Sequence, residues 1–550
     1  QKLGEDHPSV IIIKNNLACS LDDVGELEDA IRLHEEVLAW RQIRFGKESE
    51  QALASNVNLA SAHRRSGQME TAIALNQDSL EIAKRTLGPT HSTTVLILNN
   101  LGYAYGMSGN MEKAVPIAEQ VLKIREETLP MSHPDILAAR NNLAAAYGMR
   151  GRTDDAIKIL EKSHQEQISV LGEDHIDTLV TASNLAVNYS NAGRRSEAIA
   201  LKEQIYVQRK KMLGPSNSDT MIAGNNLAFD YSKVGRLPEA IALYKKVMET
   251  RQKMHGASHS ETLTAKGNLA AASKVNDQVD QAIQLYQEVL EARQGEYGAE
   301  HPSVFWAMRD LANTLSFDGQ SENAIELAER LVARATETLG AEDQQVLACK
   351  YSLGGILIDG GEFENARTLL EEVTKTNITK LGASHIGTLS CMDTLAKAYR
   401  RLEKFDSVEA TYREALKQTQ KSNTQLQMIQ RINIGLARAC FAQGKAAEAE
   451  RILKPFIPET SDDNQTPLTI RQCVTLELYG RILIELGRVE EADQPLHKAY
   501  AGLKKRLQEL PKPDRNYLLK DVLTGLVDFS KASGRENELQ KWTDLLLEVE

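Results

Sequence analysis

Cysteine, aromatic residues and long apolar runs are scarce in this chain, and each scarcity excludes a class of protein. No two cysteines form a Cys-x-x-Cys pair, which argues against a disulfide framework or a zinc site and indicates a reducing compartment. No stretch approaches the roughly 18 apolar residues that a membrane-spanning helix needs. We therefore expect a cytoplasmic protein without membrane insertion. The five cysteines are Cys19, Cys349, Cys391, Cys440 and Cys473.

An excess of positive charge is also missing. The chain has 65 Lys and Arg against 76 Asp and Glu, a net charge of −11, whereas a general nucleic-acid binder needs a basic footprint. A length of 550 residues exceeds one ordinary globular core, so several domains or one elongated array are expected. Aromatic residues make up 5% and charged residues 26% of the chain, which suits a helical protein. The mean hydropathy of −0.37 is typical of a soluble, folded one.

Motifs of catalysis are absent. The stretch "HEEVL" begins with His34 but has Leu38 in place of the second histidine of a zinc-protease motif, and "FGKES" lacks the upstream glycine of a phosphate-binding loop. No GxSxG and no protein-kinase signature occurs, since Asp528, Phe529 and Ser530 are the nearest approach to DFG. We expect no enzymatic activity, no metal site and no cofactor.

What the sequence does have is a period of 42 residues. A glycine recurs at intervals of 42, or 84 where Asp277 takes its place, and Glu403 stands at the tenth position. Asn276 and Asp277 are residue types that tolerate the left-handed conformation of a helix C-cap, where glycine is usual. The absence of any insertion over ten units indicates stacked repeats. The glycines are Gly25, Gly67, Gly109, Gly151, Gly193, Gly235, Gly319 and Gly361.

Each unit has the pattern of two helices. The spacing predicts a first helix over about 9–22, with Ile13, Leu17, Ala18 and Leu21 on its buried face, and a glycine that ends it. A second helix is predicted over about 27–45, and a Leu-Gly or an equivalent pair ends it.

The units define two regions of the chain. Residues 1–420 form ten 42-residue units, the first preceded by a truncated repeat end, so we expect a piece of a longer or processed polypeptide. Residues 421–550 form about three irregular hairpins that end in a capping helix, "ENELQKWTDLLLEVE". Two proline-containing segments, Pro455–Thr469 and Glu509–Asn516, are predicted loops.

Helix pairs of this kind resemble the tetratricopeptide repeat. The third unit has Leu101 and Gly102 followed by Tyr105, and two second helices carry Ala-x-x-x-Tyr. The long period and the "LGxxHP" linker are similar to kinesin light chains and to many bacterial proteins. The resemblance implies a right-handed all-α solenoid of about 13 helical hairpins, whose concave groove binds a protein or peptide partner as a scaffold.

Two alternatives to a simple scaffold stay open. The segment that begins "RVEEADQPLHKAYAGLKKRLQELPKPDRN" is similar to the tail of planctomycete-type bacterial Ser/Thr kinases, in which a kinase domain precedes such repeats. The chain would then be the non-catalytic, regulatory part of a larger signalling enzyme. Self-association through the groove is the other alternative.

Seven histidines share one repeat position at the start of a first helix. Equivalent helices of a stack lie about 10 Å or more apart, too far for ring nitrogens to share an ion at about 2.0–2.1 Å. Three units have Ser49, Asn217 or Asp343 there instead, which favours a polar capping role. The histidines are His7, His91, His133, His175, His259, His301 and His385.

The asparagines beside the periodic leucine are the candidate binding residues. A helix interior does not favour Asn, so its retention over seven units has either a structural cause, a hydrogen bond to a neighbouring helix, or a functional one. In the functional hypothesis the amides form a ladder that holds a peptide backbone, because a carboxamide both donates and accepts. The ladder is Asn16, Asn58, Asn100, Asn142, Asn184, Asn226 and Asn268, and second asparagines precede it at Asn15, Asn99, Asn141 and Asn225.

Charged and aromatic residues a turn further on are candidates for specificity. Arg64 and Arg65 would recognise acidic features of a ligand, and Asp22 and Asp23 basic ones, with solvated charge as the alternative. Further candidates of the same kind are Lys397, Arg400 and Arg401, together with Tyr103, Phe229 and Phe317, for which core packing competes with groove lining.

Overall fold

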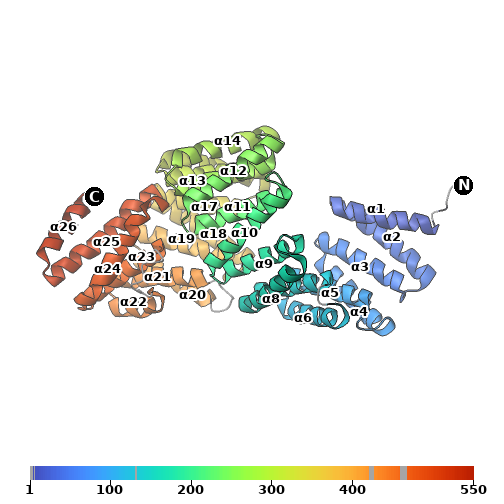
Figure 1. Ribbon diagram of the computed structural model, residues 1–550. Coiled ribbons are helices and arrows are strands. Elements are labelled where there is room, and N and C mark those ends of the chain that lie inside the picture. The colour runs from blue at the N-terminus through green and yellow to red at the C-terminus, as the bar shows by residue number, and fades with distance from the viewer. Residues whose placement is uncertain (1–3, 5, 131–132, 420–425, 459–467, 550) are drawn as a thin grey trace. The chain divides into compact units, whose positions relative to one another are not determined.

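A computed structural model describes residues 4, 6–130, 133–419, 426–458 and 468–549, and these residues form 26 α-helices and two short 3-10 helices without a strand (Figure 1). The chain divides into two compact units, residues 1–230 (unit 1) and 231–550 (unit 2). The fold is therefore all-α, an α-solenoid built from helical hairpins.

Unit 1 consists of five hairpins and the greater part of the next first helix. Its helices are α1 (Pro8–Val24), α2 (Leu27–Phe45), α3 (Glu50–Arg65), α4 (Met69–Thr86), α5 (Ser92–Met107), α6 (Met111–Thr128), α7 (Pro134–Met149), α8 (Thr153–Leu171), α9 (Ile176–Asn191), α10 (Arg195–Leu213) and α11 (Ser218–Lys233).

Unit 2 continues the same alternation. Its helices are α12 (Leu237–His255), α13 (Ser260–Val275), α14 (Val279–Tyr297), α15 (Pro302–Phe317), α16 (Ser321–Leu339), α17 (Gln344–Asp359), α18 (Phe363–Leu381), α19 (Ile386–Arg401), α20 (Phe405–Thr419), α21 (Leu426–Ala442), α22 (Ala446–Leu453), α23 (Ile470–Glu485), α24 (Val489–Lys505), α25 (Lys512–Ser533) and α26 (Glu536–Leu547).

The repeated histidines cap the first helices, as the sequence predicts. In each of the seven units, His Nδ1 accepts a hydrogen bond from the backbone N–H two residues further on, at 3.1–3.3 Å. Ser49, Asn217 and Asp343 accept equivalent backbone bonds in the remaining units. The cap satisfies one of the backbone donors that a helix start leaves free. Pro8, Pro134 and Pro302 occupy first turns, where a missing N–H costs nothing.

Two sets of glycines end the helices. The eight periodic glycines within hairpins have φ between 78° and 89°, and the two predicted exceptions, Asp277 and Glu403, adopt the same hand at φ 61° and 56°. Glycines between hairpins, such as Gly172 (φ 90°, ψ 163°) and Gly256 (φ 92°, ψ 168°), lie in a region that is essentially restricted to glycine.

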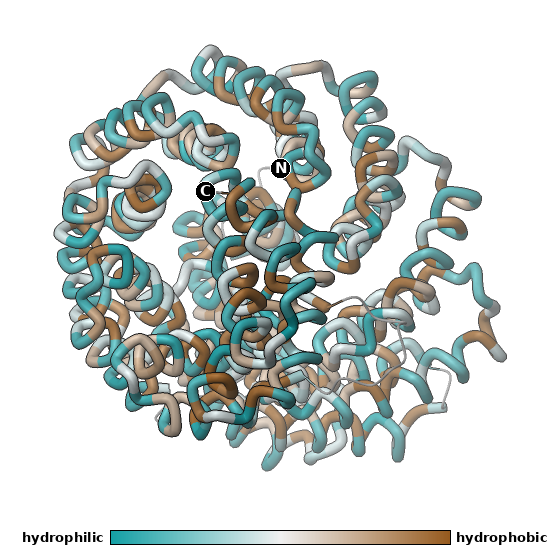
Figure 2. Tube along the Cα trace, turned by 90° about the vertical axis from the view of Figure 1, so that its left-hand side faces the viewer, coloured by the Kyte–Doolittle hydropathy of each residue, from teal (hydrophilic) through white to brown (hydrophobic). Residues whose placement is uncertain are grey.

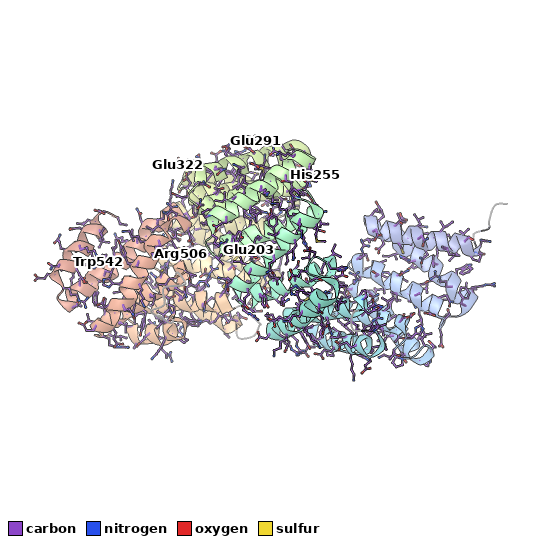
Figure 3. All side chains as sticks on the ribbon, viewed as in Figure 1. Glu203, His255, Glu291, Glu322, Arg506 and Trp542 are labelled. Carbon is purple, nitrogen blue, oxygen red and sulfur yellow. The ribbon has the colours of Figure 1, made fainter. Side chains whose placement is uncertain are left out.

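The core is a layer of small and aliphatic residues between successive helices. The periodic alanines of the second helices, for example Ala30, Ala156 and Ala282, are completely buried, which lets neighbouring helices approach closely. Apolar and polar residues alternate around the helices in Figure 2. At the C-terminal end, the Trp542 ring of α26 (Figure 3) packs against Tyr500 and His497 at centroid distances of 5.1 and 5.6 Å.

A repeated tyrosine ties adjacent hairpins together. Tyr147 donates its hydroxyl hydrogen to Glu119 at 2.7 Å, and Tyr189 donates to Glu161 at 2.7 Å, in each case 28 residues back along the chain. The guanidinium of Arg194 lies 4.2 Å from the centre of the Tyr189 ring. Desolvation and the neighbouring carboxylate raise the pKa of Tyr189 to about 12, so the hydroxyl stays a donor at neutral pH.

Two sequence predictions are wrong. Ile13 and Leu17 of α1 are 63% and 49% exposed, whereas Leu143, the equivalent of Leu17 in a later unit, is 3% exposed. The reason is that no helix of the described chain precedes α1 to cover that face. The predicted loop Glu509–Asn516 is also wrong from Lys512 onward, because α25 begins there and Pro513 stands in its first turn. Of the predicted loop Pro455–Thr469, residues 455–456 belong to a 3-10 helix, and residues 459–467 lie outside the described residues.

Candidate partner-binding surfaces

The first helices of unit 1 form what we call the first-helix wall, consisting of α1, α3, α5, α7, α9 and α11. The asparagines lie on this wall. Asn16, Asn142 and Asn226 are exposed, whereas Asn58, Asn100 and Asn184 are half-buried. Asn268 is half-buried in α13 of unit 2.

Some of the asparagines bond to a neighbouring first helix. Asn58 Nδ2 donates to Asn15 Oδ1 at 3.5 Å, and Asn142 Nδ2 donates to Asn99 Oδ1 at 3.3 Å. These bonds are long for N–H···O contacts, but each of them joins two residues that are 43 apart in the sequence. This recurrence supports the structural hypothesis, a hydrogen bond between neighbouring helices, for these pairs. Asn141 Nδ2 donates to Thr181 Oγ1 at 3.5 Å. The second asparagine Asn225 is half-buried and also has a partner.

Other asparagines keep their amides available. The side chains of Asn100 and Asn184 make no hydrogen bond within the described residues. Even a bonded asparagine has spare capacity, because the amide has two donors and its oxygen two lone pairs. The ladder thus combines interhelical bonds with free amide groups.

Large apolar side chains accompany the amides on the same helices. Tyr103, Met107, Met149, Val187 and Phe229 are each at least half exposed. They occupy only two repeat positions, three and seven residues after the ladder asparagine. A wall that exposes apolar groups in a fixed register is typical of a binding surface rather than of ordinary solvated helices.

Two hollows in unit 1 are lined by these residues. One, of about 100 Å³, lies among α5, α6 and α7, with Tyr103, Met107 and Met149 around it and Asn99 and Asn142 at its edge. Its remaining lining residues are Gly102, Gly106, Met111, Ala114, Ile117, Ala118, Val121, Ala145 and Ala146.

The second hollow, of about 440 Å³, lies among α9, α10 and α11. Val187, Ile222 and Phe229 line it together with the exposed Asn226. Its charges include an ion pair of Lys202 with Asp230. The two hollows place apolar and amide groups side by side.

The charged candidates of unit 1 contact one another. Arg65 pairs with Asp22 at 2.8 Å and lies 3.7 Å from Asp23, so the residues predicted to read opposite charges neutralise each other across adjacent units. Arg64 lies over the ring of Tyr103, with its guanidinium 4.9 Å from the ring centre. Arg64 is thus on the wall, whereas Arg65 joins two hairpins.

In unit 2 four side chains at the same two repeat positions are polar or charged. Asn313 and Lys397 correspond to Tyr103 and Phe229, and Asp359 and Arg401 correspond to Met107 and Met149. They line a cavity of about 590 Å³ among α13, α15, α17, α19 and the start of α25. The sequence predicted Lys397, Arg400 and Arg401 but missed Lys274, Arg309, Asp359 and every residue of α25. The shared repeat position was the signal that could have identified Asp359.

Burial changes the acid–base properties of this cavity. Desolvation raises the pKa of Asp359 to about 6, although Ser316 donates a hydrogen bond to its carboxylate at 2.8 Å. Burial likewise lowers the pKa of Lys274, whose ammonium lies 5.4 Å from the centre of the Phe317 ring. Phe317 itself is buried, so it belongs to the core rather than to an open surface.

Metal-ligand clusters and cysteine thiols are two chemical features that can be checked among the described residues. No group of three or more His, Cys, Asp or Glu that could hold a metal ion occurs among them. Burial raises the pKa of Cys349, Cys391 and Cys473 to about 11, which disfavours a thiolate nucleophile. Within the same residues, no helix has the length and apolar character that crossing a membrane requires.

Family models place the repeats along most of the chain. One model described as a tetratricopeptide repeat matches residues 51–127, 135–210, 265–337 and 346–421, which is more than half of the chain. A second model with the same description matches residues 10–50 and 220–261, and a third matches residues 394–462. No curated protein matches the chain.

Several solved structures are similar to part of this chain. The nearly identical TPR-like repeats of a Podosopora anserina protein described as a kinesin light chain are 32% identical, and the match covers 37% of this chain and 97% of that one at a TM-score of 0.35. A second crystal structure of those repeats is 30% identical, with coverages of 38% and 99% and a TM-score of 0.36. BtubC (BKLC) from P. vanneervenii is 18% identical, with coverages of 42% and 92% and a TM-score of 0.37. The chain belongs to the tetratricopeptide repeat family.

Proposed function

We propose that the first-helix wall of unit 1 binds an apolar segment of a protein partner. Tetratricopeptide repeats generally mediate contacts between proteins, and their fold is typically non-catalytic. The observation that carries the proposal is the exposure of Tyr103, Met107 and Phe229 on helices that also carry the asparagine ladder. Two asparagines of this ladder, Asn100 and Asn184, make no hydrogen bond within the described residues. The apolar groups would supply affinity, and the amides would hold the backbone of the segment without selecting its side chains.

The hollow beside Tyr103 provides a sharp test of the apolar part. A Cβ built on Gly106 would meet only the Met111 methyl at 3.9 Å, an ordinary contact, so a side chain can start there without a clash. Gly106→Leu should fill the hollow and raise the stability of α5, because glycine inside a helix is destabilising. The same substitution should weaken binding of the partner. Gly295→Leu is the matched control, because Gly295 lies in α14 on an exposed surface with nothing within 4 Å of its Cβ position.

The amides need a separate variant. Replacing Asn100 and Asn184 together by Ala removes two amides that make no bond within the described structure. At about 1 kcal/mol for each hydrogen bond, affinity should fall on the order of 10- to 30-fold, with helicity unchanged.

The measurement uses peptides selected from a displayed library on the full chain. Enrichment of peptides with large apolar side chains, followed by their loss with Gly106→Leu and with the double asparagine variant, supports the proposal. Equal binding to all variants refutes it. Dimerisation that rises with concentration in sedimentation, and that Gly106→Leu abolishes, would instead identify a second copy of this chain as the occupant.

The kinase-tail hypothesis is a separate function for the whole polypeptide. The complete gene product tests it, since a kinase domain in the same polypeptide would make this chain its non-catalytic part.

A further inference from the structure

The cavity of unit 2 carries an excess of positive charge. Five cationic side chains line it against three acidic ones. Arg309 pairs with Asp310 at 3.1 Å, and Arg401 lies 3.7 Å from Asp514 of α25. The remaining cations are Lys274, Lys397 and Arg400, and none of them forms an ion pair in the part of the chain that the structure describes.

One of these cations has a buried donor that is not used. Arg400 Nε is shielded from solvent and has no hydrogen-bond partner within the described residues. The guanidinium of Arg400 stacks over Tyr517 of α25 at 5.5 Å, which fixes the group without satisfying that donor. A buried donor without a partner costs free energy that an anionic acceptor would recover.

The start of α25 closes one side of the cavity. Lys512 Nζ lies 2.5 Å from Asp318 Oδ1 at the end of α15, and Arg515 lies 3.6 Å from Asp277 at the end of α13. The Tyr517 ring packs under Arg401 at 4.0 Å. A long segment of another protein would have to displace these contacts, whereas a small ligand would not. The volume of about 590 Å³ is that of an ordinary small-molecule pocket.

We propose that this cavity binds a small anion with at least two negative charges, held by Lys274, Lys397 and Arg400. Organic phosphates and polycarboxylates share this chemistry. This proposal does not rest on the proposal that the first-helix wall of unit 1 binds a protein partner.

Binding should strengthen as the pH falls through about 6. Asp359 faces Ser316 from α15, Lys397 and Arg401 from α19, and Asp514 from α25. Its pKa of about 6 means that it loses its negative charge in this range, which increases the positive excess of the cavity. Asp359→Asn should bind the anion equally well on both sides of pH 6.

The experiment is equilibrium dialysis of the full chain with labelled pyrophosphate and labelled citrate at constant ionic strength. We expect one saturable site, and the tighter of the two probes identifies the ligand class. Lys397→Gln should weaken binding about tenfold or more, as expected for a charged hydrogen bond. Asp514→Asn should strengthen it, because it releases Arg401 and removes a negative charge.

The matched control is Lys375→Gln, an exposed lysine of α18 outside the cavity. Uptake that does not saturate, or equal loss with Lys397→Gln and Lys375→Gln, overturns the proposal. The proposal would also be overturned if hexaglutamate displaced the labelled probe at a lower concentration than unlabelled pyrophosphate or citrate does. An acidic protein segment would then be the ligand. Sulfate, which keeps its charge over pH 5–8, is the probe for the pH dependence.

Discussion

The two sets of glycines make a quantitative prediction at α12. Gly235 precedes this helix and Gly256 follows it, and an added Cβ would meet nothing within 4 Å at either position, so only the backbone distinguishes them. Gly235 has φ 81°, and the equivalent residue of the next unit is Asp277 at φ 61°. Gly256 has φ 92° and ψ 168°, far from the left-handed helical region that Asn tolerates.

Asparagine at the two positions should therefore have different costs. Gly235→Asn keeps an accessible conformation and should cost less than about 1 kcal/mol. Gly256→Asn forces a conformation essentially restricted to glycine, at a cost on the order of 1–3 kcal/mol. A difference of about 2 kcal/mol corresponds to roughly a 30-fold difference in a local equilibrium constant.

Hydrogen exchange is the suitable assay, because a long repeat array does not unfold in one two-state step. Amides of α12 and α13 should exchange roughly 30-fold faster in Gly256→Asn and less than about fivefold faster in Gly235→Asn. Equal acceleration by the two variants, or a larger effect of Gly235→Asn, would refute the argument from backbone conformation.

Three further predictions concern burial, pairing and pH. Leu143→Ala should lower the free energy of local unfolding, measured by hydrogen exchange, by about 2–5 kcal/mol, and Leu17→Ala should lower it by less than about 1 kcal/mol. The reason is that the exposed fractions of the two side chains are 3% and 49%. Similar losses for both variants would show that the Leu17 face of α1 is covered. Tyr189→Phe should destabilise the contact between α8 and α9 by about 1 kcal/mol through loss of the bond to Glu161, and no change in exchange there would contradict this. Because the raised pKa of Asp359 means that folding favours its protonated form, unit 2 should lose stability as the pH rises from about 4 through 6. Asp359→Asn should abolish that loss in thermal unfolding, and an unchanged pH profile would count against the assignment.

Local chemistry accounts for the parts of the fold that could be predicted from the sequence. A cap such as His133 and a glycine such as Gly151 act within a few residues, so their period of 42 is visible in the chain itself. The left-handed Asp277 and Glu403 follow from the same register. Burial is different, because it depends on a neighbouring helix: Leu17 has the pattern of Leu143, but no helix of the described residues covers it.

The candidate site was only partly predictable for the same reason. Asn142 could be selected from its repetition, but its bond to Asn99 depends on the spacing of two helices. Arg65 and Asp22 were singled out for opposite ligands, and their contact with each other became evident only in the folded stack. The segment after Glu509 has two prolines, which fit both a loop and a first helical turn, and distant ion pairs favour the helix.

The contacts of α25 also determine how unit 2 acquires its stability. Repeat arrays normally fold by nearest-neighbour steps, and each hairpin is stabilised as soon as the next one is added. Here Arg515 contacts Asp277, and Arg438 of α21 pairs with Asp521 at 2.7 Å, so the earlier hairpins gain these bonds only after the last hairpin has been synthesised. At 5–20 residues per second, the chain between residues 277 and 515 takes roughly 10–50 s to make. Unit 2 should therefore mature late and then unfold with more cooperativity than a simple linear stack.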